Sequence, residues 1–287
     1  GIITDRRAGR IPDEYAVPLC QLLDEIRIPG IEVFVRHEKE HRAVVIFRGE
    51  GLSHEVGDTD PQKTGVPPLA PKPLCPEAEK TAGIINEFIK KAGEILPGKS
   101  PEKYRANFVM LRGFASHPGL QLFPERYLVK AVAIAEYPMY RGLARLLGMD
   151  VTEKPSGLEE EFSQLSENYN DYDFFFLHVK KTDSRGEDGN FNAKVKAIEE
   201  VDRLLPGLLE LKPDCLVIAG DHSTPAILKS HSWHPVPYML YSPVARHDKL
   251  KHFSETECAK GSLGCFPAIQ NMQLMLAHAG RLKKFGA

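Results

Sequence analysis

The sequence predicts an α/β protein in which buried strands alternate with amphipathic helices. Apolar runs such as residues 129–135 and 215–219 are typical of strands inside a parallel sheet. Between such runs, residues 191–211 place Val195, Ile198 and Val201 at helical spacing, so one face of that helix would cover the sheet. The length of 287 residues, with 42% hydrophobic and 26% charged, is ordinary for a globular protein with a substantial core.

The first part of the chain, up to about residue 120, predicts a small α+β unit. Residues 31–37 and 41–48 alternate apolar and polar side chains on either side of a short polar connection, which predicts a hairpin. Residues 61–76 are rich in proline, which cannot donate a ladder hydrogen bond, so we expect an extended loop there. The other expected elements are helices over residues 14–27 and 77–96 and a strand over residues 107–112.

The second part of the chain alternates strands and helices more regularly. Thr224 followed by Pro225 is a typical helix start, because proline fits the first helical position. We therefore divide the chain into a domain of residues 1–122 and a domain of residues 123–287. The elements expected in the second domain are strands over residues 129–135, 172–179, 214–219 and 236–241 and helices over residues 139–147, 191–211, 225–229 and 269–283.

Composition excludes several classes of function and compartment. The net charge is −2 and no tract of Lys and Arg is present, which argues against a nucleic-acid or membrane-surface partner. No apolar run reaches the roughly 18–20 residues that cross a bilayer, and the N-terminus lacks a signal-peptide pattern. The five cysteines are scattered and odd in number. We therefore predict a reducing, cytoplasmic compartment.

Polar side chains with metal-binding chemistry follow two of the predicted strands. Asp221 and His222 come directly after strand 214–219, while Asp183 and Glu187 follow strand 172–179. Ligands bind at the carboxyl edge of open α/β sheets, where these side chains and the nearby His231 would meet. Carboxylates and neutral imidazoles suit Zn²⁺ or Mn²⁺. Two such ions can clamp the attacking and leaving oxygens of an in-line displacement.

Each of these residues also has a structural interpretation. Asp221 and His222 could cap the following helix, and Asp183 and Glu187 could be turn residues of a polar loop. Taken together, the four favour a metal site over a solvated surface. His178 lies inside a predicted strand and is interpreted as a hydrogen-bonded core residue.

Four arginines form a second group with a common chemistry. Arg6, Arg7 and Arg10 lie close together near the start of the chain, and Arg112 is the last residue of the predicted strand 107–112. Guanidinium groups bind phosphate and carboxylate in bidentate fashion, so these residues are candidates for holding a phosphorylated acid. The alternative is a solvated charged face.

Several sequence runs occur in the order of a known family. They are D-R-R-A-G-R, D-T-D-P-Q, N-F-V-M-L-R-G, A-R-L-L-G-M-D-V, H-V-K-K-T-D-x-x-G-x-D-G, A-G-D-H-S-T-P, H-S-W-H-P-V-P and F-S-E-T-E-C-A-K-G-S-L-G. Over nearly the whole chain they resemble the archaeal-type cofactor-independent phosphoglycerate mutases of the alkaline phosphatase superfamily. The resemblance implies a layered sheet with helices on both faces, plus a smaller inserted lid domain that binds the substrate.

The resemblance also implies a two-ion centre that works without 2,3-bisphosphoglycerate. Asp183, the residue at 187 and His231 would hold one ion, and Asp221 and His222 would contribute to the other. The ions would be Mn²⁺, with Zn²⁺, Mg²⁺ or Co²⁺ as alternatives. The basic family positions that bind phosphoglycerate correspond to Arg6, Arg7, Arg10 and Arg112.

The sequence departs from the family pattern at three points. The family chain begins about a hundred residues earlier, a typical length for part of a domain, and that part carries an aspartate ligand and the serine nucleophile. We therefore assign no catalytic nucleophile here and expect residues 1–287 alone to lack mutase activity. Glu187 stands where the family has histidine, and Arg141, a further candidate for binding substrate, stands where lysine is expected.

The predicted activity is the interconversion of 3-phosphoglycerate and 2-phosphoglycerate, a glycolytic isomerisation. The expected partners are a small phosphorylated acid and either a complementing N-terminal polypeptide or another copy of the chain. Two other interpretations stay open at this point. One is a non-catalytic phosphate-binding fragment or half of a split enzyme, and the other is a phosphomutase or phosphohydrolase that acts on another substrate.

Overall fold

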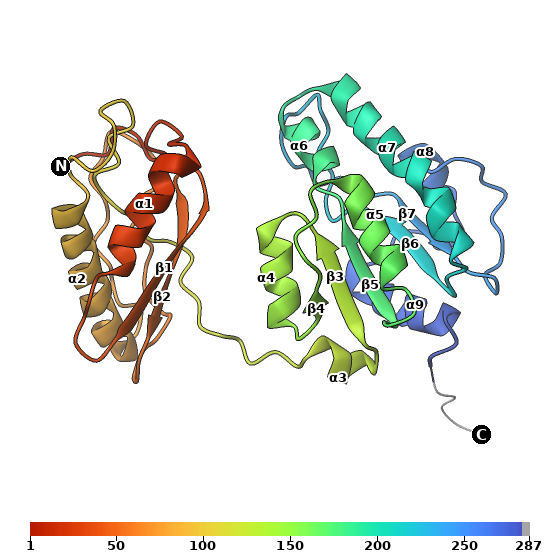
Figure 1. The fold of residues 1–287 in the computed structure, drawn as a ribbon, viewed down its shortest axis with the longest axis horizontal. Coiled ribbons are helices and arrows are strands. Elements are labelled where there is room, and N and C mark those ends of the chain that lie inside the picture. The colour runs from red at the N-terminus through yellow and green to blue at the C-terminus, as the bar shows by residue number, and fades with distance from the viewer. Residues whose placement is uncertain (283–287) are drawn as a thin grey trace. The chain divides into compact units, whose positions relative to one another are not determined.

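A computed structural model of the chain describes residues 1–282, and the chain divides into two compact units (Figure 1). The first unit is Gly1–Leu120 and the second is Gln121–Ala287. Each unit has a hydrophobic core of its own. The substrate-binding role of the first domain and the metal-binding role of the second, which the sequence suggests, stay predictions.

The first unit packs two long helices against a hairpin. The predicted hairpin is confirmed: β1 and β2 pair antiparallel, with Val33 opposite Phe47. Ile85 and Phe88 of the second helix are fully buried in the core that the hairpin covers. The elements are α1 (Asp13–Asp24), β1 (Glu32–Lys39), β2 (Arg42–Arg48), a short 3-10 helix (Pro76–Ala78) and α2 (Glu79–Ile95).

The prediction of a strand over residues 107–112 is wrong. This segment forms no ladder with another strand within residues 1–282. Leu111 instead exchanges hydrogen bonds with the buried Thr59: its N–H donates to Thr59 Oγ1 at 2.7 Å, and the Thr59 N–H donates to Leu111 O at 2.8 Å. These two hydrogen bonds satisfy the backbone N–H and C=O of Leu111 without a sheet ladder.

The second unit confirms the predicted alternation of strands and helices. Strands β4, β3 and β5 form a parallel sheet in that order, and β6 and β7 form an antiparallel pair. Helices α3, α5, α6 and α8 and the short strand β4 were not predicted. The elements are α3 (Phe123–Tyr127), β3 (Ala131–Ala135), α4 (Pro138–Leu146), β4 (Asp150–Val151), α5 (Leu158–Glu167), β5 (Phe174–His178), α6 (Lys181–Glu187), α7 (Phe191–Glu210), β6 (Leu216–Ala219), β7 (Tyr238–Tyr241), α8 (Glu255–Cys258), a 3-10 helix (Ala268–Gln270) and α9 (Asn271–His278).

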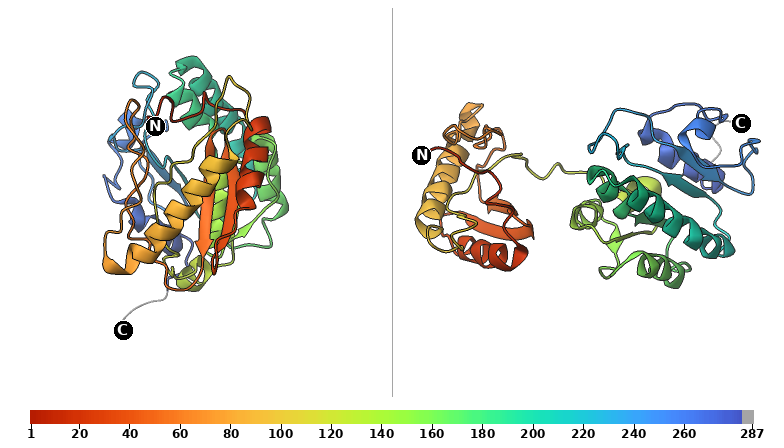
Figure 2. Two further views of the ribbon diagram at one scale, coloured as in Figure 1. Left: turned by 90° about the vertical axis from the view of Figure 1, so that its left-hand side faces the viewer. Right: turned by 90° about the horizontal axis from the view of Figure 1, so that it is seen from above.

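Helices cover both faces of the sheet in the second unit (Figures 1 and 2). Successive side chains of a strand point to opposite faces, and β3 is fully buried. Ala133 packs in one cluster with Ala144 of α4, whereas Ile134 packs in another with Phe162 of α5 and Leu208 of α7. The layered α/β architecture predicted from the sequence is therefore confirmed.

Three details of the second unit correct the prediction. Strand β6 is not a parallel strand of the larger sheet: it pairs antiparallel with β7, and within residues 1–282 it does not pair with β5. Residues 225–229 form a turn rather than a helix, in which the N–H groups of Leu228 and Lys229 donate to Pro225 O. The C-terminal helix ends at His278, and its predicted end at Lys283 lies outside the described residues.

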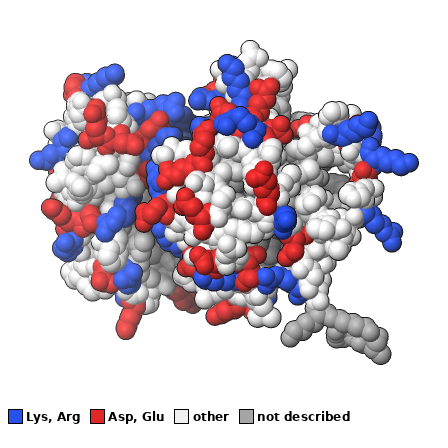
Figure 3. Space-filling view, turned by 45° about the vertical axis from the view of Figure 1, so that its right-hand side comes forward, with Lys and Arg blue, Asp and Glu red and all other residues white. Residues whose placement is uncertain are grey.

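The surface carries charges of both signs. On the face drawn in Figure 3, Lys and Arg side chains are interspersed with Asp and Glu. Within residues 1–282, no helix combines the length and the apolar character needed to cross a membrane.

Candidate metal centre

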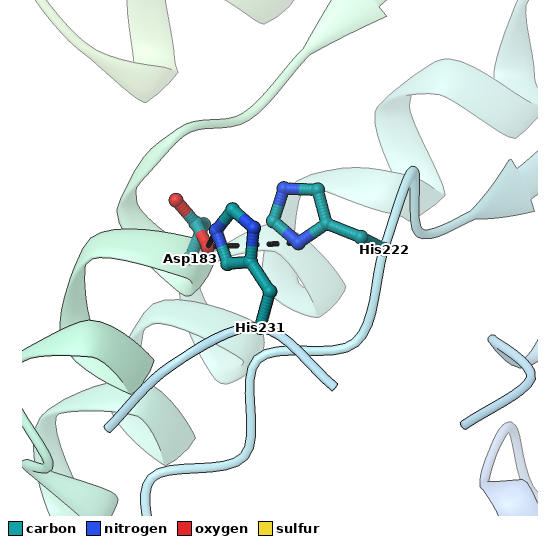
Figure 4. Close-up of side chains that lie close together, drawn as sticks. All are labelled: Asp183, His222 and His231. Atoms are coloured by element: carbon teal, nitrogen blue, oxygen red, sulfur yellow. Dashed lines mark ion pairs between the residues drawn. The ribbon is translucent and has the colours of Figure 1, made fainter. Parts of the chain in front are cut away.

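Three side chains of metal-ligand type converge in the second unit. Asp183, His222 and His231 each offer a ligand atom within 4.8 Å of the others, and Figure 4 shows the three side chains pointing toward one another. Asp183 Oδ1 lies 3.5 Å from His231 Nε2 and 3.8 Å from His222 Nδ1. The three residues come from separate parts of the sequence, so the convergence is a product of the fold.

Asp183 is presented by a helix, and not by the polar loop that the sequence analysis left open as an alternative. Strand β5 ends at His178, and α6 begins three residues later at Lys181. Gly186 of this helix is buried against Thr224, in the loop that follows β6. Since only glycine leaves room for this approach, α6 can bring Asp183 close to His222.

A short backbone contact places the two histidines together. Ser223 and Ser232 form an isolated antiparallel bridge, in which the Ser232 N–H donates to Ser223 O at 2.9 Å. His222 and His231 precede the two ends of this bridge, and their rings stack with centroids 3.8 Å apart. Ser223 therefore contributes its backbone to the arrangement of the site.

The two other predicted ligands lie beside the histidines. Asp221 Oδ2 is 3.5 Å from His222 Nε2, and Glu187 Oε1 is 3.7 Å from His231 Nε2. Asp221 is partly covered by the Tyr140 hydroxyl, which donates to Oδ2. The five predicted ligands thus lie in one neighbourhood, although only Asp183, His222 and His231 meet within 4.8 Å of one another.

Hydrogen bonds keep the two aspartates ionised, although Asp183 is mostly buried and Asp221 is partly shielded from solvent. Burial raises the pKa of the Asp183 carboxyl, but donation from Lys180 and Thr224 outweighs it and holds that pKa below its usual value. Burial likewise raises the pKa of Asp221, and the Tyr140 hydrogen bond and the His222 ring bring it below normal. Both carboxylates are therefore available as ligands at neutral pH.

Several residues of the site were not predicted as functional from the sequence. Tyr140 reaches Asp221 from α4, while Lys180 and Thr224 contact Asp183 directly. Lys194 of α7 donates to Thr224 O at 2.7 Å. No local pattern identifies these residues, because their role depends on how α4, α6 and α7 pack around the loop after β6.

The prediction that His178 is a hydrogen-bonded core residue is wrong. Its buried Nδ1 has no hydrogen-bond partner within residues 1–282, and burial lowers the pKa of the ring. The ring packs against Tyr140 in a tilted arrangement with centroids 3.9 Å apart. His178 also lines the small pocket beside the cluster, together with Lys180, Asp183, Lys194, Asp221, His222 and Thr224.

The donor set fits a divalent cation. An ionised carboxylate and two imidazoles within 4.8 Å of one another match the oxygen and nitrogen ligands of Zn²⁺ and Mn²⁺. Asp183 is held by Lys180 and Thr224, which fixes its orientation in the way that supporting hydrogen bonds orient metal ligands.

The arginines lie in different environments. Arg6 forms a bidentate pair with the buried carboxylate of Asp60, with Nε to Oδ1 at 2.9 Å and Nη2 to Oδ2 at 2.5 Å. Arg10 pairs with Glu40 at 3.2 Å and is exposed, as are Arg7 and Arg112.

Arg141 lies in the second unit, and its contacts differ from those of the other arginines. Its buried guanidinium donates to the backbone carbonyls of Ala135 at 3.0 Å and Thr152 at 2.8 Å. These bonds join the end of β3 to the segment after β4. A substrate-binding role for Arg141 stays a prediction, and its present contacts are structural.

Replacement of Gly186 by alanine is expected to destabilise the protein by about 1–3 kcal/mol, because an added methyl group would overlap Thr224 O. Mn²⁺ affinity should fall as well, since Asp183 would move away from His222. Gly142→Ala in α4 is the matched control, because a methyl group there meets nothing within 4 Å. Urea unfolding and Mn²⁺ titration of both variants measure the effects. Equal stability of the two variants would contradict the close approach of α6.

Comparison with known proteins identifies two matching families. Residues 1–100 match the model of the 2,3-bisphosphoglycerate-independent phosphoglycerate mutases, and residues 112–278 match that of the Metalloenzyme superfamily. A probable 2,3-bisphosphoglycerate-independent phosphoglycerate mutase of Thermotoga neapolitana is 51% identical over all of this chain and 71% of its own length. The corresponding protein of Aquifex aeolicus is 49% identical over the same shares.

Solved structures show the same relationship. The cofactor-independent phosphoglycerate mutase of Thermoplasma acidophilum superposes with a TM-score of 0.73 at 26% identity, over 98% of this chain and 73% of its own. A protein of Pyrococcus horikoshii gives a TM-score of 0.78 at 28% identity, over 97% of this chain and 72% of its own.

Proposed function

Because the chain belongs to the 2,3-bisphosphoglycerate-independent phosphoglycerate mutase family, we propose that it takes part in interconverting 3-phosphoglycerate and 2-phosphoglycerate. Members of this family are isomerases that use divalent metal ions. The observation that carries the proposal is the convergence of Asp183, His222 and His231 in the second unit. The unpaired cysteines support a cytoplasmic setting for this reaction.

Two ligand sets would hold the metal ions. Asp183, Glu187 and His231 form the first set, and Asp221 and His222 belong to the second. The mixture of carboxylates and imidazoles supports Mn²⁺, with Glu187 adding negative charge to the first set. When bound, such ions supply Lewis-acid polarisation of a phosphoryl oxygen. The chain itself contributes ionised, oriented carboxylates, which Lys180, Thr224 and Tyr140 hold by hydrogen bonds.

The arginines of the first unit would bind the anionic groups of phosphoglycerate. Asp60 fixes the Arg6 guanidinium through two hydrogen bonds, which leaves its remaining N–H groups in a defined position. Arg7, Arg10 and Arg112 are exposed and can reach a phosphate or carboxylate from solvent. Planar forked donors of this kind match both groups of the substrate.

A further strand would complete the sheet of the second unit. Strands β5 and β6 do not pair with each other within residues 1–282, and their side chains are mostly half-buried, whereas β3 is fully buried. Unpaired strand edges favour association with another strand. The chain spans 71% of the length of its Thermotoga relative. We propose that a polypeptide corresponding to the remainder of that relative pairs with one of these edges.

A complementation assay tests the proposed function. Residues 1–287 and the unmatched part of the Thermotoga protein would be mixed with Mn²⁺ and 3-phosphoglycerate, and enolase would report 2-phosphoglycerate. We expect turnover that needs both polypeptides and the metal, since the family resemblance would place the serine nucleophile in the unmatched part of the Thermotoga protein and a nucleophile supplies most of the rate.

Three outcomes would contradict parts of this proposal. Family-like turnover by residues 1–287 alone would show that the chain needs no complementing segment. A mixture that binds Mn²⁺ and forms a complex but makes no 2-phosphoglycerate would refute the mutase function. Release of inorganic phosphate in place of 2-phosphoglycerate would favour a phosphohydrolase.

A further inference from the structure

One buried hydroxyl joins the two proposed ligand sets. Thr224 is 3% exposed, and its Oγ1 lies 2.6 Å from Asp183 Oδ1 and 3.0 Å from His222 Nδ1. Its position is fixed on two further sides, since Lys194 Nζ donates to Thr224 O at 2.7 Å and Gly186 packs against it. The sequence predicted that Thr224 caps a helix, but residues 225–229 form a turn, so this hydroxyl serves the site instead.

The proton on this hydroxyl can serve only one of its two neighbours. A threonine hydroxyl donates one hydrogen bond and can accept others, whereas an ionised carboxylate only accepts. Asp183 is paired with the Lys180 ammonium, which favours the ionised carboxylate. Thr224 therefore donates to Asp183 Oδ1. The hydroxyl is then the acceptor toward His222, so the proton between them must sit on His222 Nδ1.

The protonation of Nδ1 decides which nitrogen of His222 can bind a metal. A neutral imidazole carries one proton, so Nε2 is left with its lone pair. This nitrogen lies 3.5 Å from Asp221 Oδ2, an oxygen that already accepts the Tyr140 hydroxyl. Two acceptors thus face each other without a proton between them, an arrangement that a cation stabilises.

The same hydroxyl separates His222 from the other ligands. His222 Nδ1 is 3.8 Å from Asp183 Oδ1, yet Thr224 bridges the two atoms. His231 Nε2, in contrast, lies 3.5 Å from Asp183 Oδ1 and 3.7 Å from Glu187 Oε1. The cluster of ligand side chains therefore divides into two sets with Thr224 at the boundary.

We propose that Thr224 is a positioning residue that orients Asp183 toward the first ion and fixes His222 in the Nδ1–H tautomer, so that Nε2 binds the second ion. The proposal rests on the proposed function for the identity of the two sets. It adds a residue that acts through its neighbours rather than on the substrate. Supporting hydrogen bonds of this kind typically change metal affinity about 10–100-fold.

The first test measures the tautomer in the metal-free wild-type chain. Imidazole ¹⁵N chemical shifts at a pH where the ring is neutral distinguish the two tautomers, and His222→Gln assigns the signals. We expect a protonated Nδ1 and an unprotonated Nε2. A protonated Nε2 in the folded protein would overturn the proposal. This measurement does not depend on mutase activity, so a correct tautomer in a protein that fails the complementation assay would refute only the proposed function.

The second test compares three variants. Thr224→Val keeps the shape but removes the hydroxyl, and we expect about tenfold weaker binding of the second Mn²⁺ together with loss of the Nδ1–H preference. Thr224→Ser keeps the hydroxyl and should restore both. Thr152→Val is the matched control, because that hydroxyl donates to Glu153 O outside the site. If Thr224→Val folds and keeps the metal affinity and the His222 tautomer of the wild type, the proposal is wrong. If Thr224→Val does not fold, the Thr224→Ser variant decides: absence of the Nδ1–H preference in that variant overturns the proposal.

Discussion

Replacement of Asp183 by asparagine is expected to lower the Mn²⁺ affinity of the chain by at least about 100-fold. Loss of a residue that only supports a metal ligand lowers the affinity about 10–100-fold, and Asp183 is itself a proposed ligand. Asp183 Oδ1 lies 3.5 Å from His231 Nε2, and Lys180 and Thr224 stabilise the negative charge of this carboxylate. Asparagine has nearly the same shape but no charge, so the variant removes the electrostatic part of the ligand with little change in packing. Calorimetric titration of the full chain with Mn²⁺ measures the affinity.

A neighbouring carboxylate provides the control for this prediction. Asp188 directly follows α6, is exposed, and pairs with Arg185 at 3.3 Å. Asp188→Asn changes the net charge by the same amount, and its Mn²⁺ affinity should stay close to that of the wild type. Circular dichroism of both variants without metal checks that they fold. An Asp183→Asn variant that folds and binds Mn²⁺ within threefold of the wild type would refute the metal centre.

The convergence of ligands could be predicted from the sequence because it follows from topology. Asp183 and His222 come soon after β5 and β6, and the expectation that ligands follow strand ends identified both residues, although β6 does not pair with β5 within residues 1–282. His231 was harder to place, because its position depends on the bridge between Ser223 and Ser232. No periodic pattern predicts a single bridge between two loop residues.

The supporting residues of the site could not be predicted from the sequence. Tyr140 and Thr224 contact ligands that are 81 and 41 residues away in the chain, so their role emerges only after packing. The antiparallel pairing of β6 with β7 was missed for a related reason. The apolar run before Asp221 fits a buried strand of either direction, and direction depends on which neighbour is available. Local sequence patterns thus predict where helices and strands form better than they predict which segments these elements contact.

A buried carboxyl outside the metal centre carries the second large prediction. Glu161 of α5 is 3% exposed, and its Oε1 accepts one hydrogen bond, from the Glu136 N–H at 3.3 Å. Burial, which outweighs this hydrogen bond, raises the pKa of Glu161 from 4.5 to about 7. The folded protein therefore keeps a proton on Glu161 at pH values where the unfolded chain has lost it.

Glu161→Gln is expected to stabilise the chain by about 3 kcal/mol at pH 8, because the raised pKa lowers wild-type stability by that order. Between pH 4.5 and 7 the folded wild type binds more protons than the unfolded chain, so its stability falls as pH rises; glutamine removes this slope. Urea unfolding at pH 4.5 and pH 8, followed by circular dichroism, measures the gain in stability and its change with pH. Glu167→Gln, exposed on the same helix, is the control. If Glu161→Gln gains no more stability between the two pH values than this control, Glu161 is ionised in the folded protein and the prediction is wrong.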